Sequence, residues 1–403
     1  MSRRTWVVVG AALAVIVLGI VLVAVTSTPS PPDATGAPSA GTVPAAASTT
    51  AVGGSQVVVA MGHLDDPSNT FSELFDRSAG STTWVLATPP GVADNGGLVV
   101  GAAPTGAQTA GFLPSANLTF SVLAQRSAAA ASWTPGIVPG ALAAEPDGLT
   151  TGSGGQVAAV LARPAPEVVT AGPGITTWRR LTTVAGLDGT SSRCAVDRVT
   201  AVAISAAGTP DLGAGCAGSA TAGIFAAAPS GGWTLLGPLA IPGAPSATQV
   251  LRLQAGTPGP TALVEGTGGP GTTLVAVWDA GGSELSGSVP LAVPTGWSLL
   301  ATSVGGGDGR AVTVLLGSAT GPQRRIEIAD GPAGGTGAGG PGAQWTVLPA
   351  PPPGTSAVAT VGAESDAFVV SGNRLTVWSL APGAARWSAP SQQTVPLQYG
   401  SSS

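Results

Sequence analysis

A histidine and two aspartates lie close together early in the folded part of the chain, at His63, Asp65 and Asp66. An imidazole beside two carboxylates can bind a metal ion, calcium included, or act as a base. Aspartates that precede a proline, as Asp66 precedes Pro67, more often make turn hydrogen bonds in a loop. We therefore treat these three residues as the candidate metal ligands, expect the segment to be a loop, and expect no bound cofactor.

Few other side chains could carry catalysis. His63 is the single histidine, so a serine–histidine–aspartate triad has no other candidate base, and the single tyrosine, Tyr399, lies in the terminal tail. Glycosidases need two carboxyl groups about 5–10 Å apart, and no spacing in the sequence identifies such a pair. The sequence therefore names no catalytic residue. It does not decide whether the chain is an enzyme, although it favours a protein that is not.

The two cysteines, Cys194 and Cys216, could form one covalent link. An even number of cysteines in an exported chain favours a disulfide. We expect the two residues on neighbouring strands of one sheet, although a simple hairpin register leaves them several residues out of opposition. The expected bond is structural, because no C-x-x-C redox motif is present.

These residues belong to a repeat that begins at about Ser55. Each copy contains short apolar runs, a turn rich in Gly, Ser and Thr, and a closing strand. The closing strands begin 42 to 60 residues apart and no segment shows helical spacing of apolar residues, so the period fits one four-stranded propeller blade. We predict an all-β fold, a seven-bladed β-propeller over residues 55–400, with six or eight blades if a repeat is miscounted. The closing strands begin at Trp84, Trp133, Trp178, Trp233, Leu285, Trp345 and Trp387.

Tryptophan opens six of these seven closing strands. A large ring between adjacent blades supplies the hydrophobic contact that a thin blade lacks. We therefore interpret the series as blade-packing residues. A platform on which sugar rings stack is the alternative interpretation. The series consists of Trp84, Trp133, Trp178, Trp233, Trp345 and Trp387.

The turn before these tryptophans resembles the Asp-box turn of sialidase-like propellers, in which Ser or Thr, Asp and Gly lead into an aromatic residue. Asp76, Gly80 and Trp84 supply the acid, the glycine and the aromatic at a stretched spacing, whereas the turns before Trp178 and Trp233 lack the acid. The resemblance implies an exported propeller fold. Sialidases resemble one another in an arginine triad and a tyrosine nucleophile, and the single tyrosine here, Tyr399, lies in the terminal tail. The resemblance therefore implies fold and not activity.

An uninterrupted apolar run covers residues 6–25, directly after Arg3 and Arg4. At about 1.5 Å per residue it spans roughly the 30 Å hydrocarbon core of a bilayer, and the positive-inside rule keeps residues 1–5 in the cytoplasm. We predict an uncleaved signal anchor, with a cleaved signal peptide as the alternative. Residues 26–54, rich in Thr, Ser, Pro and Ala, predict a disordered stalk. The repeats are then extracytoplasmic, on a single-pass protein of the cell membrane.

Charge is scarce in this chain. Charged residues make up 9% of it, all 15 basic residues are arginine, and the formal net charge is −5. With no basic cluster, nucleic acid is excluded as an expected partner. The absence of lysine in a chain rich in Ala and Gly indicates GC-rich coding, and we take the source to be bacterial.

The anchor, the stalk, the propeller and the poor catalytic inventory together favour a surface-displayed binding or scaffold module that contacts an envelope protein or a glycan. The alternative is an exported glycoside hydrolase or lyase that uses carboxylates in the central channel. A spacer without a ligand is a third hypothesis. Closure of the ring also leaves two alternatives: residues 393–399 add a strand to the first blade, or residues 49–52 supply it.

Overall fold

Contacts between residues divide the chain into two compact units, Met1–Pro38 and Ser39–Ser403, and every described residue belongs to the second. The predicted membrane span at residues 6–25 lies outside the described residues. Among the described helices, none is long and apolar enough to cross a membrane. The computed structural model describes residues 45–49, 54–62, 70–78, 80–90, 97–103, 105–113, 119–127, 132–143, 148–237, 239–243, 245–256, 259–281, 284–305, 311–318, 324–330, 344–361 and 364–395.

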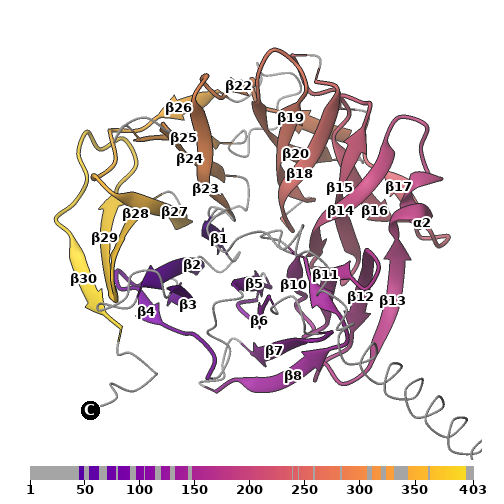
Figure 1. Cartoon of the computed structure of the whole chain (residues 1–403), viewed down its shortest axis with the longest axis horizontal. Helices are drawn as coiled ribbons and strands as arrows, with labels where there is room; N and C mark the ends of the chain where they lie inside the picture. The colour runs from indigo at the N-terminus through magenta and orange to yellow at the C-terminus, as the bar shows by residue number, and fades with distance from the viewer. Residues whose placement is uncertain are drawn as a thin grey trace, which may run out of the picture. The chain divides into compact units, whose positions relative to one another are not determined.

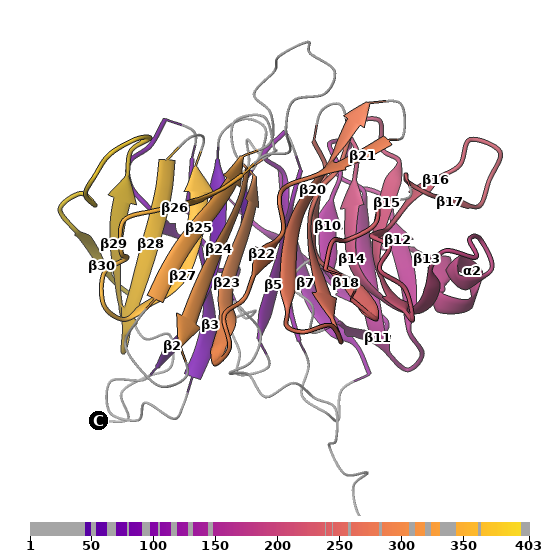
Figure 2. The ribbon, with the colours of Figure 1, turned by 90° about the horizontal axis from the view of Figure 1, so that it is seen from above.

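Nearly all regular secondary structure in the described chain is β-strand, which confirms the all-β prediction. Strands that are consecutive in the chain pair antiparallel, and the resulting meanders stand side by side around a central axis, a propeller-like arrangement (Figure 1, Figure 2). The one described helix is α2 (Val184–Asp188). The strands are β1 (Ala45–Thr49), β2 (Ser55–Gly62), β3 (Thr70–Arg77), β4 (Val85–Leu86), β5 (Leu98–Ala102), β6 (Gln108–Phe112), β7 (Ser121–Arg126), β8 (Thr134–Val138), β9 (Ala141–Leu142), β10 (Leu149–Thr151), β11 (Val157–Arg163), β12 (Glu167–Ala171), β13 (Trp178–Thr183), β14 (Ala195–Ile204), β15 (Pro210–Ala217), β16 (Gly223–Ala227), β17 (Trp233–Leu235), β18 (Ala247–Gln254), β19 (Thr261–Thr267), β20 (Thr273–Gly281), β21 (Glu284–Gly287), β22 (Leu291–Ala292), β23 (Trp297–Gly305), β24 (Ala311–Ser318), β25 (Arg324–Asp330), β26 (Trp345–Val347), β27 (Thr355–Val361), β28 (Glu364–Ser371), β29 (Arg374–Leu380) and β30 (Ser391–Thr394).

Hydrogen bonding joins the meanders of the described chain into five sheets. Two sheets are single meanders, β5–β8 and β27–β30, and a third holds β10–β13 with β9 beside β11. The other two each combine a pair of meanders, because β15 pairs with β18 and β1 lies between β2 and β23.

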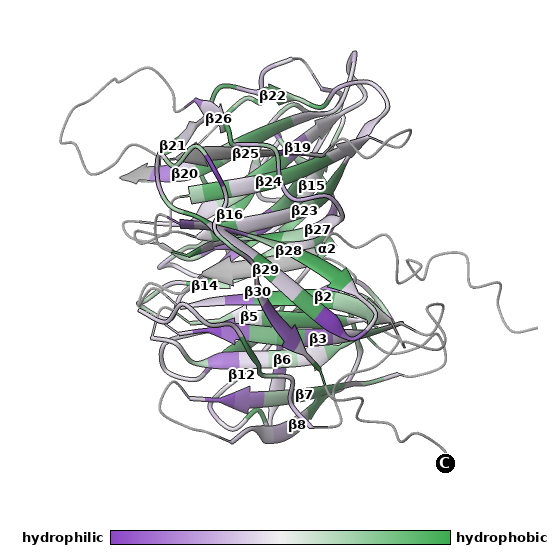
Figure 3. Cartoon of the chain, turned by 90° about the vertical axis from the view of Figure 1, so that its left-hand side faces the viewer, coloured by the Kyte–Doolittle hydropathy of each residue, from purple (hydrophilic) through white to green (hydrophobic). Residues whose placement is uncertain are grey.

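The strands are nearly continuous apolar runs because most of them are covered on both faces. In β14, Val202 and Ile204 pack in one buried cluster, whereas the alternating Ala201 and Ala203 pack in another that includes Val250 of β18. Successive side chains of a strand point to opposite faces, so a sheet held between two neighbours buries both sets. Burying one aliphatic side chain contributes about 1.5–3 kcal/mol. Figure 3 shows the resulting concentration of apolar residues along the strands.

The innermost strand beside β2 comes from the segment predicted to be a disordered stalk. β1 pairs antiparallel with β2, from Ala47 opposite Val57 to Thr49 opposite Ser55, and parallel with β23. The prediction for residues 26–54 is therefore wrong at residues 45–49. Short side chains such as alanine carry little strand propensity, and it is main-chain pairing on both sides that places β1.

Closure of the ring follows neither sequence alternative completely. β30 pairs with β29 of its own meander, so the prediction that residues 393–399 extend the first blade is wrong at Gln393 and Thr394; residues 396–399 lie outside the described residues. The N-terminal segment supplies the inner strand instead, a few residues earlier than predicted, at β1.

The predicted disulfide between Cys194 and Cys216 is confirmed, with the two Cα atoms 4.8 Å apart and both residues fully buried. Two β-bulges in the β14–β15 pair explain how the residues meet. The register shifts once between Val196 and Arg198 and once between Val199 and Ala201, so Cys216 lies opposite Val196. Without the bulges Cys216 would lie opposite Arg198, too far along the strand to reach Cys194.

Removing this bond should destabilise the β14–β17 meander. We expect the double variant Cys194→Ala/Cys216→Ala to lose about 2–4 kcal/mol of unfolding free energy, because a cross-link mainly restricts the unfolded chain. Alanine avoids burying an unpaired hydroxyl at these two fully buried positions. Denaturation followed by circular dichroism, with and without reductant, measures the change. Identical unfolding curves for wild type in both conditions would contradict the expectation.

Candidate functional site

The predicted metal ligands His63, Asp65 and Asp66 lie outside the described residues. Within the described ranges, no group of three or more histidine, cysteine, aspartate or glutamate side chains is placed to hold a metal ion. The metal site therefore stays a prediction. The candidate functional site consists of other polar residues that the sheets bring together.

The sheets have two distinct ends. β1 is parallel to β23, and corresponding residues of neighbouring inner strands touch: Thr151 Oγ1 donates to Gly101 O at 3.1 Å, and Thr200 Oγ1 donates to Val250 O at 2.6 Å. Residues at or near the ends of β5, β10, β14 and β18 line one pocket, so these inner strands end on the same side. We call the end where they finish the turn face, and the opposite end, where β1 begins, the base face. The turn face is marked by Thr49, Ala102, Thr151, Ile204 and Gln254.

A pocket opens between the inner strands β5, β10, β14 and β18 near the turn face. Its walls are mostly small and apolar, with Thr150 and Gln254 as the polar side chains. None of the lining residues is titratable, so the pocket walls carry no acid or base. They are Val100, Gly101, Ala102, Leu149, Thr150, Val202, Ile204, Leu253, Gln254 and Ala255.

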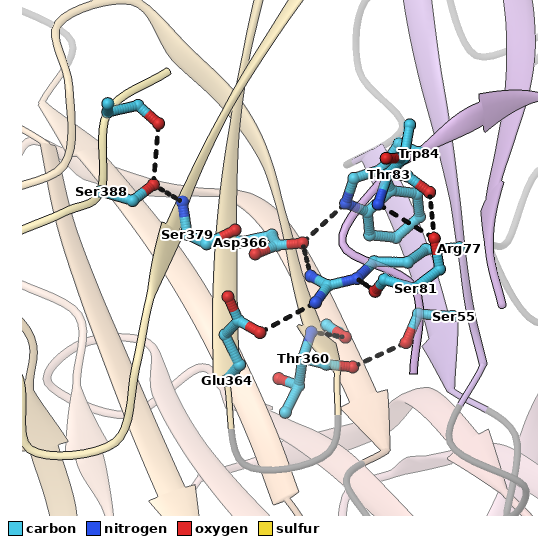
Figure 4. Close-up of polar contacts among 12 residues, drawn as sticks. Ser55, Arg77, Ser81, Thr83, Trp84, Thr360, Glu364, Asp366, Ser379 and Ser388 are labelled. Carbon is cyan, nitrogen blue, oxygen red and sulfur yellow. Dashed lines mark hydrogen bonds and ion pairs between the residues drawn. The ribbon is translucent and has the colours of Figure 1, made fainter. Parts of the chain in front are cut away.

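Charged side chains at the turn face join the β27–β30 meander to β2–β4 (Figure 4). Arg77, at the end of β3, donates from Nη1 to Asp366 Oδ2 at 2.6 Å and from Nη2 to Glu364 Oε2 at 2.9 Å. Trp84 Nε1 donates to the same Asp366 oxygen at 2.6 Å, and Arg77 Nε donates to Ser81 O. The side chains of Arg77 and Asp366 are 5% and 0% exposed. We call Arg77, Trp84, Glu364 and Asp366 the closing cluster.

The electrostatics of the closing cluster are those of a desolvated ion pair. Burial raises the pKa of Asp366, and the charge of Arg77 and the hydrogen bonds only partly offset this effect. Burial opposes the charge on Arg77, but Asp366 and Glu364 together raise its pKa. Each charge is therefore tolerated in this position because of the other.

A second polar cluster lies at the turn face between β2–β4 and β5–β8. Asp76 Oδ2 accepts from Arg126 Nη2 at 2.8 Å, and Asp76 Oδ1 accepts from Gln56 Nε2 and Gln108 Nε2, each at 3.0 Å. Arg126 also lies over the indole of Trp133, with Cζ 4.7 Å from the ring centroid. This cluster keeps partial access to solvent, since the Arg126 and Asp76 side chains are 18% and 14% exposed.

Five of the six predicted packing tryptophans donate an indole hydrogen bond to the neighbouring meander. Trp133, Trp178 and Trp345 bond to the main-chain oxygens of Ala87, Ile137 and Val289 at 3.1, 3.0 and 2.8 Å. Trp387 bonds to Pro349 O and Ala350 O, and Trp84 joins the closing cluster. Trp233 packs instead against a buried cluster that includes Val168 of β12.

A third turn-face junction brings two acids together. Asp211, the second residue of β15, is 7% exposed. Asp279, near the end of β20, packs so closely against Gly259 that a Cβ there would lie 2.1 Å from Asp279 Oδ2. Burial, and then the negative charge of Asp279, raise the pKa of Asp211 to about 7.

Sequence reasoning missed all three junctions. Asp76 was singled out for a turn motif, yet its side chain bonds across to the next meander. Arg77, Arg126 and Asp211 had no motif at all. One signal was available. Arg77 and Arg126 each end a strand in a chain with very few charges. A charged residue at the end of a strand lies where it can reach the neighbouring meander.

No family model and no curated protein matches the chain. Among solved structures, a mutant of the Aleuria aurantia lectin in complex with Fucalpha1-6GlcNAc is 16% identical with a TM-score of 0.40, covering 75% of this chain and 97% of the lectin. Apo AztD from Citrobacter koseri is 8% identical with a TM-score of 0.43, covering 84% and 95%. At such scores the likeness carries no functional meaning, so any function must be argued from the chain's own contacts.

Proposed function

We propose that this chain is a membrane-anchored, extracytoplasmic binding module for a glycan or a protein of the cell envelope. The observation that carries the proposal is the central pocket, whose lining holds no titratable side chain. The charged residues of the closing cluster and of the Asp76–Arg126 cluster are engaged in ion pairs between meanders. A surface of this kind suits recognition more than acid–base chemistry.

The proposal includes a seven-bladed propeller, with blades β1–β4, β5–β8, β10–β13, β14–β17, β18–β21, β23–β26 and β27–β30. Each blade then has four strands and a tryptophan or leucine at or near the start of its outer strand. The indole hydrogen bonds to neighbouring meanders support the interpretation of the tryptophans as blade-packing residues.

The turn face is the proposed recognition surface. β1 begins at the base face, and β30, with Val395 bonded to Asn373, also ends there. The turn face is therefore the end that lies opposite both the first and the last described residues of the propeller. Arg126, Gln108 and Trp133 supply donors, acceptors and an indole surface at this face, which suits the hydroxyl groups and apolar faces of a sugar.

Binding to isolated envelope glycans tests the proposal. With the full chain in detergent, we expect Arg126→Ala to weaken binding by roughly tenfold or more, as arginine hot spots do. Arg374→Ala, at the exposed start of β29 on the base face, is the matched control and should bind as wild type. Equal losses for both variants, or no binding by wild type, would contradict the assignment.

One observation favours the second candidate, a carboxylate-dependent glycoside hydrolase. Burial and the negative charge of Asp279 raise the pKa of Asp211 to about 7, a value that suits a general acid. Asp211 is nearly buried between two meanders and does not line the pocket, which ranks this candidate lower. Hydrolysis of a glycan that Asp211→Asn abolishes would reverse the ranking.

A further inference from the structure

The junction between the β14–β17 and β18–β21 meanders is arranged like the closing cluster. The two differ in the charge of the residue that acts on the buried aspartate. In both places an aspartate lies near the start of the second strand of one meander, and the charged residue that acts on it lies near the end of the third strand of the neighbouring meander. Asp366 faces the guanidinium of Arg77. Asp211 instead lies within the electrostatic influence of Asp279, whose negative charge raises the pKa of Asp211.

Strand alternation places both carboxyl groups on the same inner side of this junction. Gly213, on the Asp211 side of β15, lies against β18, because a Cβ there would be 2.6 Å from Val250 Cγ1. Val275 and Val277, on the Asp279 side of β20, pack in the same buried cluster as Val250. The two acids therefore lie at the turn-face edge of one apolar interface between the two meanders.

Among the described residues, no cation offsets the burial of Asp211. The residues opposite Asp211 on β14 and β16 are Ala203 and Ala226. Arg198 reaches Gln249, towards the base face, and Arg252 bonds to Thr302 of β23. Of the charged groups on the packed strands, Asp279 alone acts on Asp211. Those charged groups are Asp197, Arg198, Arg252, Glu265 and Asp279.

We propose that this junction is a proton-dependent switch, closed while Asp211 is protonated and loosened when Asp211 carries a charge beside Asp279. Two carboxylates that share a desolvated space cannot both ionise without strong repulsion. The pKa of Asp211, about 7, sets the transition near neutral pH. The switch stands on these contacts alone and does not rest on the proposed function.

The central pocket shares its walls with this junction. Ala203, opposite Asp211, lies between the pocket-lining Val202 and Ile204, and Leu253 and Gln254 of β18 line the same pocket. A loosened junction therefore changes the spacing of β14 and β18 and with it the width of the pocket.

The sign of the pH effect is set by the direction of the shift. The pKa of Asp211 is raised from 3.8 to about 7 in the closed junction. The closed form therefore holds a proton that the open form releases, and its stability falls as pH rises from about 4 to 7. Above about pH 7 the loss of stability is complete and no longer changes with pH.

Hydrogen exchange of the full chain between pH 4 and 8 tests the switch. After correction for the intrinsic pH dependence of exchange, we expect protection of β14 and β18 amides near the turn face to fall by up to about tenfold per pH unit up to pH 7. Amides of β27 and β28 at the closing cluster should show no such slope.

Variants separate the switch from general pH effects. Asp211→Asn should keep β14 and β18 protected at every pH, and Asp279→Asn should move the transition to lower pH. Asp197→Asn, on the neighbouring strand β14 but 43% exposed, is the control and should keep the wild-type slope. A flat wild-type profile, an unchanged slope in Asp211→Asn, or an equal slope at β27 and β28 would overturn the proposal.

Discussion

Replacing Arg77 by alanine should lower the free energy of unfolding by about 3–5 kcal/mol, because removal of one partner leaves an uncompensated buried charge. Asp366 is fully buried and its Oδ2 accepts from Arg77 and Trp84. Without the guanidinium, Asp366 must take up a proton or stay charged without its cation, and Glu364 loses its bond to β3 as well. Urea denaturation followed by circular dichroism measures the loss.

The loss should shrink in acid. Removing Arg77 raises the pKa of Asp366 further above its unfolded value, so the stability of the variant falls as pH rises above about 4 and is partly restored below it. The double variant Arg77→Met/Asp366→Leu, which removes both charges and fills the space, should be more stable than Arg77→Ala. Arg374→Ala is the exposed control. An Arg77→Ala loss under about 1 kcal/mol, or one independent of pH, would show that the pair does not hold the ring closed.

The strands were predictable, because their signal is local. Runs such as the one from Val199 to Ile204 are apolar and β-branched, and turns rich in Gly bound them. Burial on both faces of each sheet is what selects such runs. The same logic located the tryptophans and the cysteine pair, although not the two bulges that bring Cys194 beside Cys216.

The junctions were not predictable from one sequence. Arg77 and Asp366 meet because the ring brings the last meander beside the first, and nothing near either residue indicates the other. β1 illustrates a different limit: its alanines carry no strand signal, and its placement comes from the exposed edges of β2 and β23. Contacts that depend on closure of the ring can be identified only when the position of every meander is known.

Replacing Trp84 by alanine should cost about 3–5 kcal/mol, the usual range for removal of a buried aromatic side chain. Trp84 is 2% exposed, its ring meets Phe368 edge to face at 4.9 Å between centroids, and its Nε1 donates to Asp366. The substitution thus opens a cavity between the first and last meanders and removes a hydrogen bond to a buried carboxylate. Denaturation curves measure the loss.

Two comparisons separate these contributions. Trp84→Phe keeps most of the ring contact with Phe368 and removes the Nε1 donor, so it should lose about 1.5–3 kcal/mol, the range for a hydrogen bond to a charged group. Trp345→Ala removes a half-buried ring whose donor bonds to Val289 O near solvent, and it should lose less than half as much as Trp84→Ala. Equal losses at Trp84 and Trp345 would mean that the tryptophans are interchangeable packing groups. A larger loss at Trp84 would show that closure of the ring depends on the junction where Trp84, Arg77 and Asp366 are buried together.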